Sequence, residues 1–169
     1  MAKSIALYSP KDVTVLLGGF YQVDGYSADT FINIRKDTKP FDAMKSMDGE
    51  QARIYRKDEG YTVEITLAQS SATNNILSTL YNVDVATQMG KFPLLIKDLK
   101  GSTTFFAGTA WVEDIPDVQF SQELTTRTWV IGTSEAGLNV GGNQENSTAL
   151  DILGIGSSAL GVLSDIGVI

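Results

Sequence analysis

An unbroken alternation of apolar and polar residues between positions 61 and 68 constrains this chain more than any other feature. The alternating sets are Tyr61, Val63, Ile65 and Leu67 against Thr62, Glu64, Thr66 and Ala68. Successive side chains of a β-strand point to opposite faces, so a period of two predicts a strand with one buried face. A shift of one residue would expose the whole apolar set. We therefore expect an antiparallel strand whose odd-numbered residues enter the core.

Similar patterns elsewhere predict a mainly β chain with a single helix. Further strands are expected at 13–17, 20–23, 31–36, 51–57, 92–97, 102–113, 125–133 and 138–140. Residues 58–60 are expected to form a tight hairpin that joins the strand at 51–57 to the strand at 61–68. The helix should begin after the hydroxyl-rich residues 70–73 and end near 82–84. Its apolar stripe is Ile76, Leu77, Leu80 and Tyr81. Trp111 and Trp129 are expected to pack in the core.

Composition removes most catalytic chemistry. The chain has no cysteine and no histidine, which excludes thiolate nucleophiles, imidazole bases and the commonest ligands of zinc. A carboxylate pair such as Glu113 with Asp117 would remain for glycoside hydrolysis, but both residues are better explained as strand-end and turn carboxylates. We expect neither an enzyme nor a cofactor or metal.

Charge is distributed unevenly. The net charge is −7, and Arg127 is the only basic residue after position 100, against eight acidic ones. Such a segment should repel nucleic acid. The first residues, MAKSIALYSPKD, lack the apolar run of a signal peptide. Asp151 and Asp165 interrupt the apolar stretch 149–169, so we expect no insertion into a membrane.

Residues 37–50 do not fit a compact domain. We expect a loop there, and loops of that length are uncommon and are usually functional or disordered. Its apolar residues Phe41, Met44 and Met47 argue against disorder, because they need a surface on which to be buried.

Several segments, in order, resemble the tail tube proteins of long-tailed bacteriophages. They are YSPKDVTVLLGG at 8–19, DTFINIRKD at 29–37, MDGEQARIYRKDEGYTVEITLAQSSATNNILSTL at 47–80, PLLIKDLKGSTTFFAGTAWVEDIPDVQFSQE at 93–123, RTWVIGT at 127–133 and GGN at 141–143. The resemblance implies a tail-tube fold, an antiparallel β-sandwich or barrel with one flanking helix, over residues 1–143. It implies hexameric rings stacked into a hollow tube through which DNA leaves the capsid.

The same resemblance implies a location in the virion, after assembly in the cytoplasm of the bacterial host. Implied partners are further copies of the chain and the tail sheath, baseplate and tail terminator proteins. Residues 144–169 have no counterpart in the family. This apolar extension is expected to be ordered by docking on the outer surface of the tube or on an adjacent subunit, or else to strap its own domain.

These expectations name two sets of functional residues. Phe41, Met44 and Met47 are expected to contact a subunit of the next ring. The acidic residues expected to face the bore are Glu64 and some of Glu113, Asp114, Asp117 and Glu123. Other functions stay open: a minor tail protein such as a terminator or sheath component, a monomeric ligand-binding β-barrel and, most remotely, a carboxylate-dependent hydrolase.

Overall fold

A computed structural model describes residues 8–142. The elements follow the chain as a 3-10 turn at Pro10–Asp12, β1 Val13–Leu17, β2 Tyr21–Gln22, β3 Ile32–Lys36, β4 Phe41–Lys45, β5 Gln51–Tyr55, β6 Tyr61–Ala68, α1 Thr73–Thr87, β7 Phe92–Asp98, β8 Thr104–Asp114, β9 Thr126–Thr133 and β10 Ala136–Asn139. The chain is thus mainly β, and its strand pairs are antiparallel. The expected fold class is confirmed. The expectation for the extension 144–169 lies outside the described residues.

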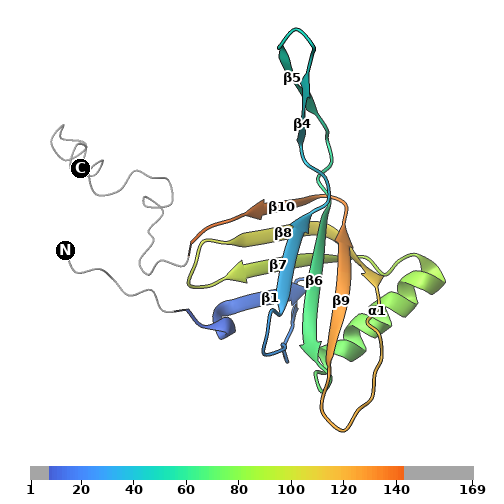
Figure 1. Ribbon diagram of the computed structural model, residues 1–169. Helices are drawn as coiled ribbons and strands as arrows, with labels where there is room; N and C mark the ends of the chain where they lie inside the picture. The colour runs from blue at the N-terminus through green and yellow to red at the C-terminus, as the bar shows by residue number, and fades with distance from the viewer. Residues whose placement is uncertain (1–7, 143–169) are drawn as a thin grey trace, which may run out of the picture.

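Strand β8 joins two layers of one continuous sheet. The strand order is β2-β1-β7-β8-β9-β6-β3, and β10 also pairs with β8. The first half of β8 lies between β7 and β10, because Phe105 pairs with both Ile96 and Leu138. Its second half pairs with β9, with Val112 opposite Ile131. Figure 1 shows the result, in which β3, β6 and β9 cross in front of β1, β7, β8 and β10.

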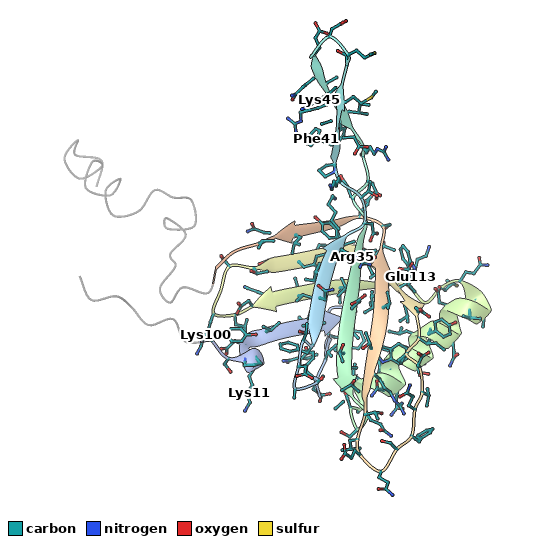
Figure 2. All side chains as sticks on the ribbon, in the orientation of Figure 1. Lys11, Arg35, Phe41, Lys45, Lys100 and Glu113 are labelled. Atoms are coloured by element: carbon teal, nitrogen blue, oxygen red, sulfur yellow. The ribbon has the colours of Figure 1, made fainter. Side chains whose placement is uncertain are left out.

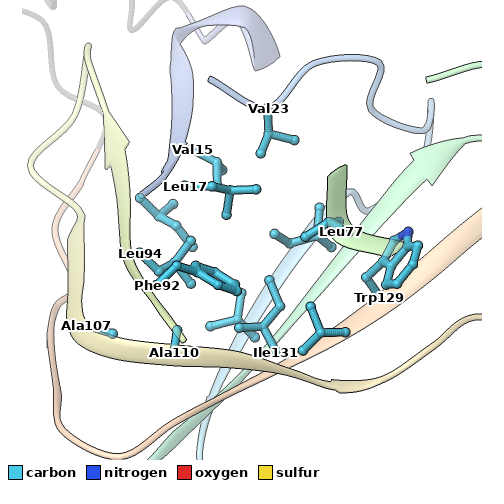
Figure 3. Packing of buried hydrophobic residues seen from close by; sticks show 14 of the residues in the cluster. Val15, Leu17, Val23, Leu77, Phe92, Leu94, Ala107, Ala110, Trp129 and Ile131 are labelled. Atoms are coloured by element: carbon cyan, nitrogen blue, oxygen red, sulfur yellow. The ribbon is translucent and has the colours of Figure 1, made fainter. Parts of the chain in front are cut away.

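The core lies between these layers and confirms the predicted register of β6. Val63, Ile65 and Leu67 are fully buried. Tyr61 is half-buried, and its ring meets the ring of Phe105 edge-on with the centroids 5.5 Å apart. Figure 3 shows the surrounding cluster, to which β1, β7, β8 and β9 contribute buried side chains.

Helix α1 covers one side of this core through Leu77, which is fully buried. Beside Leu77, the indole Nε1 of Trp129 donates a 2.8 Å hydrogen bond to Asn74 Oδ1 (Figure 3). Asn74 Nδ2 in turn donates to the carbonyl oxygens of Ala68 and Ser71, both at 3.0 Å. One polar side chain therefore links the first turn of the helix to the end of β6 and to the core.

The helix begins and ends differently from the sequence-based prediction. Its N-cap position is Ala72, with no capping side-chain bond, and its last residue is Thr87 rather than 82–84. The final turn lies beyond the apolar stripe and exposes Val83 and Val85, so core periodicity does not mark it. The helix stops at Gln88, whose φ of 60° is left-handed.

The largest correction concerns residues 37–60. The segment 37–50 is not a loop, and the strand at 51–55 does not pair with β6. Instead β4 and β5 pair with each other in a separate two-stranded sheet, while β6 pairs with β3 and β9. Residues 58–60 therefore connect this hairpin to β6 and are not a hairpin turn. Within residues 8–142, no helix has the length and apolar character needed to cross a membrane.

Candidate assembly surfaces

The β4–β5 hairpin projects from the body as an arm (Figure 1). We use "the arm" for residues 40–56. The two strands are in register from the pair Phe41–Tyr55 to the pair Lys45–Gln51, and a turn at 46–50 closes them. Gly49 sits in that turn with a φ of 86°, a backbone conformation that glycine adopts without steric cost.

The two faces of the arm differ in chemistry. One face, called here the basic–aromatic face, consists of Phe41, Ala43, Lys45, Gln51, Arg53 and Tyr55. Its ring centroids of Phe41 and Tyr55 lie 5.4 Å apart, and the guanidinium carbon of Arg53 lies 3.9 Å from the Phe41 centroid. The opposite face consists of Asp42, Met44, Ala52 and Ile54, and Asp42 forms a 2.7 Å salt bridge with Arg56.

The body of the protein leaves both faces exposed. Phe41 is 44% exposed, Met44 58% and Met47 106%, and Figure 2 shows side chains projecting on all sides of the arm. The three residues expected to contact a neighbour all lie on this arm. They do not share a face, however, because Phe41 and Met44 lie on opposite sides and Met47 lies in the turn.

Asp58 fastens the base of the arm. Its carboxylate accepts hydrogen bonds from the Thr38 hydroxyl at 2.6 Å and from the Gly60 backbone N–H at 3.0 Å. The Lys36 ammonium donates to the Asp58 carbonyl at 3.0 Å. The bond from Thr38, then the bond from Gly60, hold the pKa of Asp58 below its usual range, because each favours the charged carboxylate.

The outward side of β3, β6, β9 and β8 carries three of the five carboxylates expected in the bore, and we call it the acidic face. Because Ile65 is buried, Glu64 points away from the core. Cross-strand pairing places Glu64 beside Val130, and Val130 beside Asp114. Glu113 lies over Gly132, where a Cβ atom would come within 2.8 Å of its Oε2 (Figure 2). The structure therefore brings Glu64, Glu113 and Asp114 to one face.

The other two carboxylates, Asp117 and Glu123, lie on the long connection between β8 and β9. We call residues 115–125 the β8–β9 loop. Asp117 lines a groove of about 360 Å³ with Asp114, Thr128 and Val130, so it borders the acidic face. Glu123 lies further along the loop and is exposed.

The β8–β9 loop also exposes apolar side chains that the sequence analysis missed. They are Ile115, Val118, Phe120 and Leu124. Phe120 is 79% exposed and Leu124 76%. The sequence did contain a signal for this surface. Loops are usually polar, and this loop carries apolar residues just as residues 37–50 do. The sequence analysis considered this segment only for the charge of Asp117 and Glu123 and not for its apolar residues.

A third surface is the open end of the sandwich between β1 and β3. This hollow has a volume of about 760 Å³, and its apolar wall includes Val13, Ile32, Ile34, Ile96 and Phe105. It would suit an apolar ligand. Within residues 8–142, no three carboxylates are grouped closely enough to hold a metal ion.

These features define a class of protein: an antiparallel sandwich with one covering helix, whose distinctive surfaces are exposed apolar and charged patches. The chain matches no family model. It is 30% identical over 156 residues to "Structural protein ORF10" of Pseudomonas phage KPP10, an alignment that covers 88% of this chain and 90% of that protein. The chain therefore belongs to the family of phage structural proteins that includes ORF10.

A solved structure shares the fold at low sequence identity. A chain from the virion of a native gene transfer agent particle superposes with a TM-score of 0.53 and 9% identity, over 79% of this chain and 100% of that one. A chain from the anti-feeding prophage cap, described as the AFP tube terminating cap, gives a TM-score of 0.47 and 15% identity, over 82% of this chain and 96% of that one. The expectation of a phage structural protein is confirmed by the sequence relative.

Proposed function

We propose that this chain is the repeating subunit of a phage tail tube, forming hexameric rings that stack around a bore through which DNA passes. The observation that carries the proposal is the arm. A two-stranded hairpin is marginally stable alone in water, and this one exposes Phe41, Met44 and Tyr55 away from the core. Contact with another subunit would stabilise its strands and bury these side chains.

Ring formation is supported by sheet edges. Among the described residues, β3 pairs with β6 alone and β10 pairs with β8 alone, so each leaves one edge free. Monomeric proteins usually protect such edges, because they invite pairing with another chain. In a ring, the edge of one subunit meets a different surface of the next, and the series closes by rotation.

The acidic face is the candidate wall of the bore. Glu64, Glu113 and Asp114 give it negative charge, with Arg35 as a basic residue on β3. Repulsion between such a wall and the phosphates would keep DNA from binding. At 0.1 M salt it would act over about 10 Å, so the duplex would be held near the axis. Asp117, at the border of this face, would add to the same field.

The proposal places the chain in the virion, assembled in the host cytoplasm and meeting sheath, baseplate and terminator proteins at the outside and ends of the tube. The experiment that tests it is negative-stain electron microscopy of the purified full chain. Stacked rings with a central hole are the expected result. Single rings that never stack would favour a terminator, and a stable 18 kDa monomer on gel filtration would favour a ligand-binding protein.

A further inference from the structure

We infer that the β8–β9 loop is the surface that receives the arm of a second copy of this chain. The inference rests on the proposed function, because it requires copies to stack, and it identifies the surface on which the arm docks. Three observations support it: position, exposed apolar area and charge.

The arm and the β8–β9 loop lie at opposite ends of the molecule (Figure 1). The arm extends from the ends of β3 and β6 at 36–61, whereas the loop closes the other end of the same layer, between β8 and β9. At about 3.3 Å per residue, strand β4 and its flanking residues reach roughly 25 Å beyond the body. An arm of that reach can contact a copy placed above it along the same axis.

The loop offers apolar area that the rest of its own chain leaves exposed. Phe120 and Leu124 are more than three-quarters exposed, and Ile115 and Val118 about half. The arm presents the same kind of surface, with Phe41 and Tyr55 side by side. Joining the two patches would remove both from water at once. Buried aromatic anchors of this kind carry a large share of the energy in protein interfaces.

Charge selects the face of the arm that docks. The basic–aromatic face has Lys45 and Arg53 and no acidic residue within its strands. The β8–β9 loop has Asp117 and Glu123 and no basic residue. These opposite signs attract, whereas two loops would repel each other; the arm as a whole is neutral, because Asp42, Asp48 and Glu50 balance Lys45, Arg53 and Arg56. Complementary charge of this type sets orientation and register more than raw affinity.

The contact joins two different surfaces at opposite ends of the molecule, so a pair of copies leaves one arm and one loop without a partner. A stack of any length still offers free arms at one end and free loops at the other, so the series remains open. The inference thus explains how one chain could supply both halves of every junction in a tube.

The test uses the full chain with Phe41→Asp in the arm and, separately, Phe120→Asp in the loop. Each variant alone should still form rings, but the concentration needed for these rings to stack should rise at least tenfold. Mixed as preformed rings, the two should give paired rings and no longer stacks, because one intact arm meets one intact loop. Leu99→Asp, an exposed apolar position in the β7–β8 turn, is the matched control and should stack normally.

A second pair of variants tests charge and guards against local unfolding of the loop. Reversal of Lys45 and Arg53 to Glu, or of Asp117 and Glu123 to Lys, should weaken stacking about tenfold at low salt. Combining both reversals in one chain should restore it. Normal stacking by Phe120→Asp, mixed rings that stay single, or no rescue by the combined reversal would each overturn the inference and leave the tube proposal intact. A wild-type chain that stays monomeric would overturn both.

Discussion

Replacing Phe41 by Asp should block stacking while leaving each subunit folded. Phe41 is 44% exposed, and an aromatic side chain has roughly 200 Å² to bury, so about 90 Å² would be lost from the interface. At about 25 cal/mol per Å², the loss is about 2 kcal/mol for each arm. That energy corresponds to roughly a 30-fold weaker contact. In a ring, every subunit loses it at the same junction.

The subunit itself should be almost unaffected. Phe41 lies outside the hydrophobic core cluster, and substitutions of exposed residues usually change the free energy of unfolding by about 0.5 kcal/mol or less. The assay compares two measurements on the same sample. Sedimentation or light scattering reports stacking as a function of concentration, and urea denaturation followed by circular dichroism reports the stability of the subunit.

The matched control is Asp42→Asn on the opposite face of the arm. It removes the exposed salt bridge to Arg56, and such pairs contribute less than about 1 kcal/mol. Stacking of this variant should stay close to wild type. The reasoning is refuted if Phe41→Asp stacks at wild-type concentrations. It is also refuted if the substitution lowers the free energy of unfolding of the subunit by as much as it weakens the contact between rings.

Three further predictions concern the core, the base of the arm and the bore. Asn74→Leu should lower the free energy of unfolding, measured by urea denaturation, by about 2–4 kcal/mol, because the buried indole N–H of Trp129 loses its acceptor. In a Trp129→Phe background the same substitution should lower it by less. Equal losses in both backgrounds would contradict the role of the Asn74–Trp129 hydrogen bond. The pKa of Asp58 is lowered in the folded chain, so its carboxylate stabilises the base of the arm at any pH above the pKa of the unfolded state. This contribution is lost as the pH falls through the lower pKa of the folded state. Below about pH 4, an acid protease should therefore cleave the arm faster. Asp58→Asn should be cleaved fast at every pH, and an unchanged profile would refute the role of Asp58. Assembled rings with Glu64→Lys and Glu113→Lys should retain DNA in a gel-shift assay at 50 mM salt, and wild-type rings that bind equally well would count against an acidic bore.

Local sequence was sufficient wherever one face of an element had to be buried. The alternation at 61–68 predicted both the strand and its register, because each core residue of β6 is two positions from the next and the pleat allows no other arrangement. Helix α1 was located by Leu77 and its neighbours, but its last turn was not, because that turn touches no core.

Pairing between strands could not be read from the same patterns. The segment 51–55 alternates as a strand whether its partner is β6 or β4, and every one of its residues is exposed. Because this strand has no buried face, its periodicity does not indicate which strand it pairs with. The short connection at residues 58–60 suggested β6, which is the wrong partner. Strand β5 cannot pair with β6, because β3 and β9 occupy both edges of β6, and it pairs with β4 instead.

The sequence by itself determined the class of fold, most of the core, the absence of cysteine and histidine chemistry and the residue types available for assembly. Trp111, which was expected in the core, instead lies next to the buried Val112 on the opposite face of β8 and outside the core cluster. The tertiary structure alone decided where those residues stand. It separated Glu123 from the acidic face, gathered Glu64, Glu113 and Asp114 on one side of a sheet, and set the arm and the β8–β9 loop at opposite ends. The physical reason is that burial acts on each residue locally and leaves a periodic trace, whereas a surface is assembled from segments far apart in the chain, whose proximity depends on every strand between them.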